Sequence, residues 1–132
     1  MRIGRWGFVL ACCGMSLTAF AAGAAVTQDS FLVRNTGDLV DLCSAPQTDP
    51  LYTAAVNFCH GFGVGVVRVL QEEEAASRSR HLFCLPNPAP TRNEAVARFV
   101  QWASADSSRL QMPAEDGIAT YLSQQYPCPR GR

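Results

Sequence analysis

The sequence predicts an all-α domain cross-linked by disulfide bonds. Apolar residues recur at helical spacing between capping and proline signals, and no stretch alternates apolar and polar residues as a half-buried strand does. In addition, four cysteines, Cys43, Cys59, Cys84 and Cys128, follow an export signal. Exported proteins enter an oxidising compartment, where disulfides form and where small domains often depend on them for stability.

Residues 1–25 have the form of a signal peptide. Arg2 and Arg5 supply a positive start, residues 8–22 are almost wholly apolar, and small residues follow up to Ala24 and Ala25. This arrangement is typical of a segment that directs export and is then removed. We therefore expect cleavage near Ala24 or Ala25 and a periplasmic mature protein.

Two other interpretations of this segment stay open. A lipoprotein signal ending at Cys12 would have an unusually short apolar stretch, and an uncleaved anchor would use the whole apolar run, which approaches the roughly 20 residues that span a bilayer. Cleavage leaves residues 26–132, about 107 residues, which is enough for a single domain. After cleavage we expect no membrane association.

The charge composition argues against nucleic-acid binding. The chain has 11 basic residues, all arginine, and 11 acidic ones. Without Arg2 and Arg5 the remaining chain is slightly acidic and shows no concentrated basic face, which a nucleic-acid surface requires.

The first two helices are expected over residues 36–43 and 50–76. Asn35 or Thr36 can cap the first. Asp49 followed by Pro50 is a good start for the second, because the carboxylate accepts a free amide hydrogen and proline loses nothing at the first helical position. Apolar residues on most of its faces predict that this second helix is central to the fold.

The last two helices are expected over residues 91–105 and 113–125. An extended linker containing Cys84 precedes the third helix, whose Thr91 and Glu94 have the spacing of a capping box. A polar loop over 105–112 separates it from the fourth helix. Gly117 should weaken that helix by about 1 kcal/mol relative to alanine.

Four cysteines allow three disulfide connectivities, and sequence alone does not choose among them. If the last two helices form an antiparallel hairpin, the entrance of one lies beside the exit of the other. Cys84 then meets Cys128, and Cys43 is left with Cys59. We take this pairing as the working hypothesis.

Other candidate sites are few. Gly61 and Gly65 lie four apart, a spacing that lets a neighbouring helix pack closely. The two histidines, His60 and His81, have no partner at metal-ligand spacing, so no metal or cofactor is predicted. No nucleophile has a base and an orienting group at recognisable spacing, so we do not predict an enzyme.

Taken in order, these segments resemble the Rap/Tai family of type VI secretion immunity proteins. The resemblance covers nearly the whole mature chain, although the end of the third helix and the extra Gly63 depart from the family pattern. It rests on the short helix from Thr36 to Cys43, on Cys59-His60-Gly61-Phe62 with Gly65, on Phe83-Cys84-Leu85-Pro86 with Thr91, and on Tyr126-Pro127-Cys128.

The resemblance implies a periplasmic inhibitor, not a catalyst. Its partner would be a secreted amidase toxin that degrades peptidoglycan, and homodimers are common among such proteins. The family's protruding binding loop would correspond to Asp106, Ser107, Ser108, Arg109, Leu110 and Gln111, which could equally form a plain helix connection. A small periplasmic acid-stress chaperone and an envelope accessory protein are the alternative functions.

Overall fold

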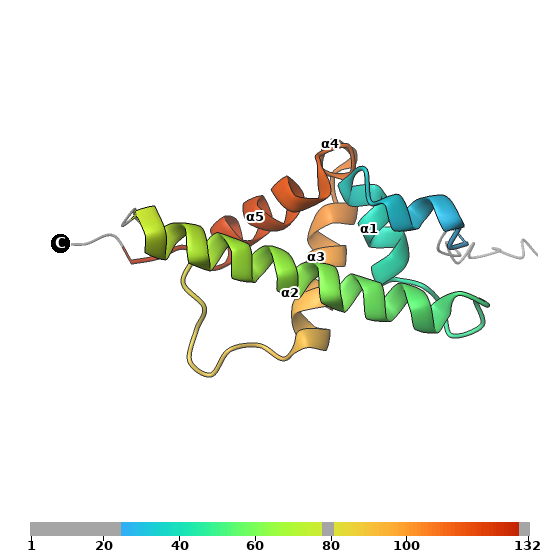
Figure 1. Cartoon of the computed structure of the whole chain (residues 1–132), viewed down its shortest axis with the longest axis horizontal. Helices are drawn as coiled ribbons and strands as arrows, with labels where there is room; N and C mark the ends of the chain where they lie inside the picture. The colour runs from blue at the N-terminus through green and yellow to red at the C-terminus, as the bar shows by residue number, and fades with distance from the viewer. Residues whose placement is uncertain (1–24, 78–80, 130–132) are drawn as a thin grey trace, which may run out of the picture.

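The computed structural model describes residues 25–77 and 81–129, so nearly all of the predicted signal peptide lies outside the described residues. Within them the fold is all-α, as predicted, and no strand occurs. Figure 1 shows the longest helix running along one side of the others. The elements are the 3-10 helix η1 (Gln28–Leu32) and the α-helices α1 (Thr36–Cys43), α2 (Tyr52–Ser77), α3 (Arg92–Ser104), α4 (Ser107–Leu110) and α5 (Ala114–Gln125).

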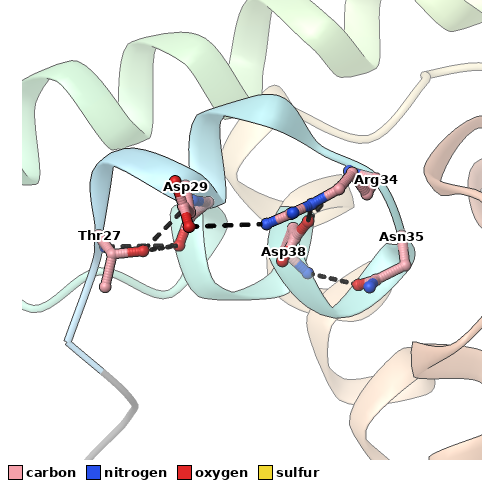
Figure 2. Close-up of polar contacts among 6 residues, drawn as sticks. Thr27, Asp29, Arg34, Asn35 and Asp38 are labelled. Atoms are coloured by element: carbon pink, nitrogen blue, oxygen red, sulfur yellow. Dashed lines mark hydrogen bonds and ion pairs between the residues drawn. The ribbon is translucent and has the colours of Figure 1, made fainter.

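The entry into α1 is fixed by polar contacts (Figure 2). The side chain of Asn35 accepts a hydrogen bond from the Asp38 N–H at 2.9 Å, which confirms Asn35 as the cap. Arg34 reaches between two carboxylates, 4.0 Å from Asp29 and 3.7 Å from Asp38. Between η1 and this cap, Val33 adopts a left-handed conformation with φ of 45°, uncommon for a β-branched residue, and so turns the chain into α1.

Asp49 organises the start of α2 and also holds the N-terminal segment. One carboxylate oxygen accepts from the Leu51 N–H at 2.8 Å and the other from the Val26 N–H at 3.0 Å. The prediction that α2 is central to the fold is wrong, because only Ala55 and Cys59 are fully buried along its length. One side of α2 packs on the core, and other apolar faces stay uncovered.

The third helix begins with the predicted capping box. The Thr91 hydroxyl accepts from the Glu94 N–H at 3.3 Å, and the Glu94 carboxylate accepts from the Thr91 N–H at 2.8 Å. The predicted polar loop over 105–112 is corrected: it contains the helical turn α4. The Asp106 side chain caps that turn, so the described fold has five α-helices where four were expected.

The core lies where α1 meets α3 and α5. Leu39 and Leu42 of α1 are almost wholly buried. Beside them is an aromatic cluster in which the rings of Phe99, Trp102 and Tyr121 lie with centroids 5.6 to 6.2 Å apart. These separations are in the range of favourable aromatic pairs.

Both predicted disulfides are present. Cys43–Cys59 joins the end of α1 to α2, and Cys84–Cys128 joins the linker before α3 to the segment after α5. A backbone hydrogen bond of 2.7 Å from the Cys84 N–H to the Tyr126 carbonyl oxygen reinforces the second link. The linker before α3 and the segment after α5 therefore lie side by side, and the pairing is the one predicted.

Candidate protein-interaction surface

The six residues predicted to contact a partner form the α4 turn, which projects where the chain passes from α3 to α5 (Figure 1). Asp106, Ser107, Ser108 and Gln111 are exposed. The Asp106 carboxylate accepts hydrogen bonds from the Ser108 hydroxyl at 2.8 Å and from the Ser108 N–H at 2.9 Å. These two bonds lower the pKa of Asp106, so the turn keeps a negative charge at its N-terminal end.

Arg109 and Leu110 face the body of the protein. The Arg109 guanidinium lies 4.5 Å from the centroid of the Trp102 ring and donates a 2.6 Å hydrogen bond to the Trp102 carbonyl oxygen. Leu110 is half-buried and packs against the core. Two of the predicted contact residues are therefore anchors of the turn, while the exposed ones remain available to a partner.

Thr36 holds the C-terminal side of the turn. Its N–H donates to the Met112 carbonyl oxygen at 2.7 Å. Its hydroxyl lies 3.2 Å from the same oxygen and 3.3 Å from the Pro113 carbonyl oxygen. Because Thr36 is fully buried, the turn is attached to α1 as well as to α3 and α5.

A second exposed surface runs along α2. Gly61 and Gly65 are exposed, and an added Cβ at either would meet nothing within 4 Å. The expectation that they pack against a neighbouring helix is therefore wrong within the described part of the chain. Phe58 and Val69 are also exposed, at 37% and 57%, which leaves an apolar face with a flat centre.

Length and composition alone would let α2 cross a membrane, and only 11% of its most apolar window is buried within the described fold. The Cys43–Cys59 disulfide ties this helix to α1. Its apolar character is accounted for in part by packing, since Phe62, Val66 and Leu70 lie against the core.

Residues 35–128 match the family model described as Rap1a immunity proteins. The chain belongs to this family. No curated protein and no solved structure is significantly similar to it. The matched span begins at the α1 cap and ends at Cys128, so it contains both disulfides and the α4 turn.

Membership of the Rap1a family confirms the resemblance at the level of an immunity family. It indicates an immunity function against a secreted effector, and thus a cognate effector as binding partner. Proteins of this kind are typically not enzymes. The two disulfides and the family are consistent with a location outside the cytoplasm.

Among the described residues of this Rap1a protein, no three His, Cys, Asp or Glu side chains gather as a metal site would need. His81 instead lies 2.9 Å from the Glu74 carboxylate. Sequence reasoning missed the anchoring roles of Arg109 and Thr36, which depend on tertiary contacts. It could have found the α4 turn, because an aspartate followed by two serines is a helix-capping pattern.

Proposed function

We propose that this Rap1a protein is a periplasmic immunity protein that binds and inhibits a peptidoglycan amidase delivered by a type VI secretion system. The observation that carries the proposal is the α4 turn, an exposed polar projection anchored to α1 and α3. Family membership over residues 35–128 supports an effector as partner. The type of effector is inferred from the resemblance of the cysteine and glycine motifs.

The structure of the turn suits it to enter a cleft. It presents the Ser107 hydroxyl and the Gln111 amide on a short helical turn whose backbone is fixed by Asp106, Arg109 and Thr36. A projection that is already ordered loses little conformational entropy when it binds, so more of the contact energy appears as affinity. Polar groups that converge from one turn also supply specificity, because a partner that leaves them unpaired is disfavoured.

The predicted signal peptide and the disulfides support the periplasmic location in this proposal. The described domain contains two disulfides in about 100 residues, and such bonds persist in oxidising compartments. Peptidoglycan lies in the same compartment, so toxin and inhibitor would meet where the toxin acts.

The α2 face defined by Phe58, Gly61, Gly65 and Val69 is the surface that suits the expected homodimer. Glycines at this spacing allow two helix backbones to approach, and the flanking apolar side chains would be buried between them. Size-exclusion chromatography with light scattering tests this pairing. Replacement Gly65→Glu should convert a dimer to a monomer, whereas Thr53→Glu, at an exposed position of α2 outside this face, should not.

The experiment that tests the proposed function begins by capturing partners. The protein, purified after export with its disulfides intact, is immobilised and exposed to secreted and envelope extracts of its own and competing strains at neutral and acid pH. We expect retention of one stoichiometric peptidoglycan amidase at neutral pH. Retention of many proteins only in acid would instead identify a chaperone and overturn the proposal.

The retained amidase is then assayed on purified peptidoglycan with the inhibitor titrated in. Ser107→Arg places a bulky charge on the exposed turn and should weaken inhibition by at least about tenfold. Gln125→Arg makes the same change at an exposed position at the end of α5 and should leave inhibition unchanged. Equal inhibition by wild type and Ser107→Arg would show that the turn is not the contact.

A further inference from the structure

A cavity of about 460 Å³ lies between α2 and the surface formed by α3, α5 and the linker that precedes α3. Figure 1 shows this linker, in yellow, arching away from α2 before it enters α3. The walls are mainly apolar and include Val67 of α2, Val96 and Phe99 of α3, and Leu122 of α5. The volume falls within the roughly 300–1,000 Å³ range of small-molecule sites.

The charged side chains that line this cavity are all of one sign. Arg68 of α2 and Arg92 of α3 line it, whereas no aspartate or glutamate does. Neither arginine forms an ion pair or a hydrogen bond within the described residues. Two guanidinium groups without an acidic partner beside an apolar cavity are complementary to a ligand with an apolar body and an anionic group.

The inner wall adds hydrogen-bonding capacity that the protein does not use. Tyr121 and Tyr126 both line the cavity, and the hydroxyl of each is buried with no hydrogen-bond partner among the described residues. Tyr121 is only 3% exposed. Burial, and to a lesser degree interaction with the adjacent Tyr126 hydroxyl, raises the pKa of Tyr121. Both hydroxyls therefore stay protonated, and even if one donates to the other, the pair keeps a donor for a ligand.

The other polar side chains in the lining, His60 and Gln71, can also donate hydrogen bonds. The cavity therefore offers apolar contact and donors, with no negative charge. Buried polar groups in proteins are normally paired, and an acceptor brought by a ligand would pair the unused donors here.

We propose that this cavity binds a single-chain fatty carboxylate, with the acyl chain against the apolar walls and the carboxylate held by Arg68 and Arg92. A neutral amphiphile would leave both guanidinium groups unpaired, and a cationic one would be repelled by them. This binding is separate from toxin inhibition, since the cavity lining includes none of the residues of the α4 turn.

The probe is dodecanoate, added below its micelle-forming concentration to the exported, oxidised protein. Trp102 is the sole tryptophan outside the predicted signal peptide, and its ring stacks 6.2 Å from that of Phe99 in the cavity wall. Its fluorescence and titration calorimetry should therefore report binding. We expect saturable binding at one molecule per chain, and binding of dodecyltrimethylammonium at least about tenfold weaker.

Two pairs of variants locate the site. Arg68→Gln and Arg92→Gln should each weaken dodecanoate binding by about tenfold, the effect of losing one charged hydrogen bond, whereas Arg98→Gln, outside the lining, should not. Ala95→Phe fills the cavity and should abolish binding, while Ala97→Phe on the exposed side of α3 should preserve it.

Circular dichroism establishes whether each variant is folded. If Ala95→Phe does not fold, the site is tested by Arg68→Gln and Arg92→Gln, and undiminished binding by both would overturn the proposal. Absence of saturable binding, equal binding of the cationic probe, or undiminished binding by folded Ala95→Phe would each overturn the proposal. Because the assay contains no toxin, failure of the immunity function would leave its outcome unaffected.

Discussion

Gly117 of α5 lies directly against Thr36 of α1. A Cβ added at position 117 would lie 3.1 Å from Thr36 Cγ2 and 3.2 Å from Thr36 Cβ, and would overlap Thr36 Oγ1. This close approach lets the buried Thr36 hydroxyl reach the carbonyl oxygens of Met112 and Pro113. The glycine that weakens α5 as an isolated helix is therefore required by the packing of α5 on α1.

Gly117→Ala should destabilise the protein by about 1–3 kcal/mol, the usual cost of forcing an extra methyl group into a packed core. Urea unfolding followed by circular dichroism measures the change. The matched control is Gly63→Ala in α2, where an added Cβ also meets nothing within 4 Å. There alanine should increase stability by up to about 1 kcal/mol. The same glycine-to-alanine replacement should therefore lower the free energy of unfolding at one site and raise it at the other.

Loss of either disulfide should lower stability through the entropy of the unfolded chain. The bonds span 16 and 44 residues, which corresponds to about 3 kcal/mol for Cys43–Cys59 and about 4 kcal/mol for Cys84–Cys128. Paired replacements of both cysteines by alanine, compared by thermal unfolding, test this order. If removing Cys43–Cys59, the bond that closes the shorter loop, caused the larger loss of stability, native-state contacts and not loop length would determine the contribution of each disulfide.

Arg109→Ala should loosen the α4 turn and cost about 1 kcal/mol, because it removes both the guanidinium over the Trp102 ring and the hydrogen bond to the Trp102 carbonyl oxygen. Hydrogen exchange of the Gln111 and Met112 amides, which bond within the turn, should accelerate. Arg98→Ala, which changes an exposed arginine of α3 outside the turn, should leave these amides protected.

Glu74→Gln should destabilise the protein at neutral pH but not in acid. Hydrogen bonds from the Leu82 N–H and then from His81 lower the pKa of Glu74 below its ordinary value of 4.5. The stabilisation from the carboxylate is therefore present above pH 4.5 and disappears as the pH falls through the lowered pKa. Urea midpoints of wild type and Glu74→Gln should differ at pH 7 and converge below pH 4.5.

Asp41→Asn should have the opposite effect. Burial, and secondarily the negative charge of Asp38, raises the pKa of Asp41 above its ordinary value of 3.8. The folded state thus holds this proton more tightly than the unfolded state, and ionisation lowers stability as the pH rises above 3.8. Asp41→Asn should be more stable than wild type at pH 7 and equally stable in strong acid. Since it changes the net charge as Glu74→Gln does, net charge cannot explain opposite results.

Local signals predicted much of this fold. Asn35 and the Thr91–Glu94 capping box act within one helical turn, so their consequences are visible in the sequence. The disulfide pairing was predicted from an assumed arrangement of the last two helices, and the structure has the same pairing.

Features that depend on tertiary contacts were missed. Apolar residues on many faces of α2 suggested a helix surrounded by others, whereas one of those faces lines a cavity and another is exposed. Gly61 and Gly65 have the spacing of a packing motif, but among the described residues nothing packs against them. The sequence marked Arg109 as part of the candidate binding loop, yet only the position of Trp102 makes it an anchor.

The order of the disulfides along the chain bears on how the protein is made. The four described cysteines are bonded in consecutive pairs, Cys43 to Cys59 and Cys84 to Cys128. In an oxidising compartment, an oxidase that joins each thiol to the next one along the chain would produce the native pairing directly, without reshuffling by an isomerase. Because Cys128 lies 44 residues after Cys84, the second bond closes only after the segment that contains α3, α4 and α5 has been made.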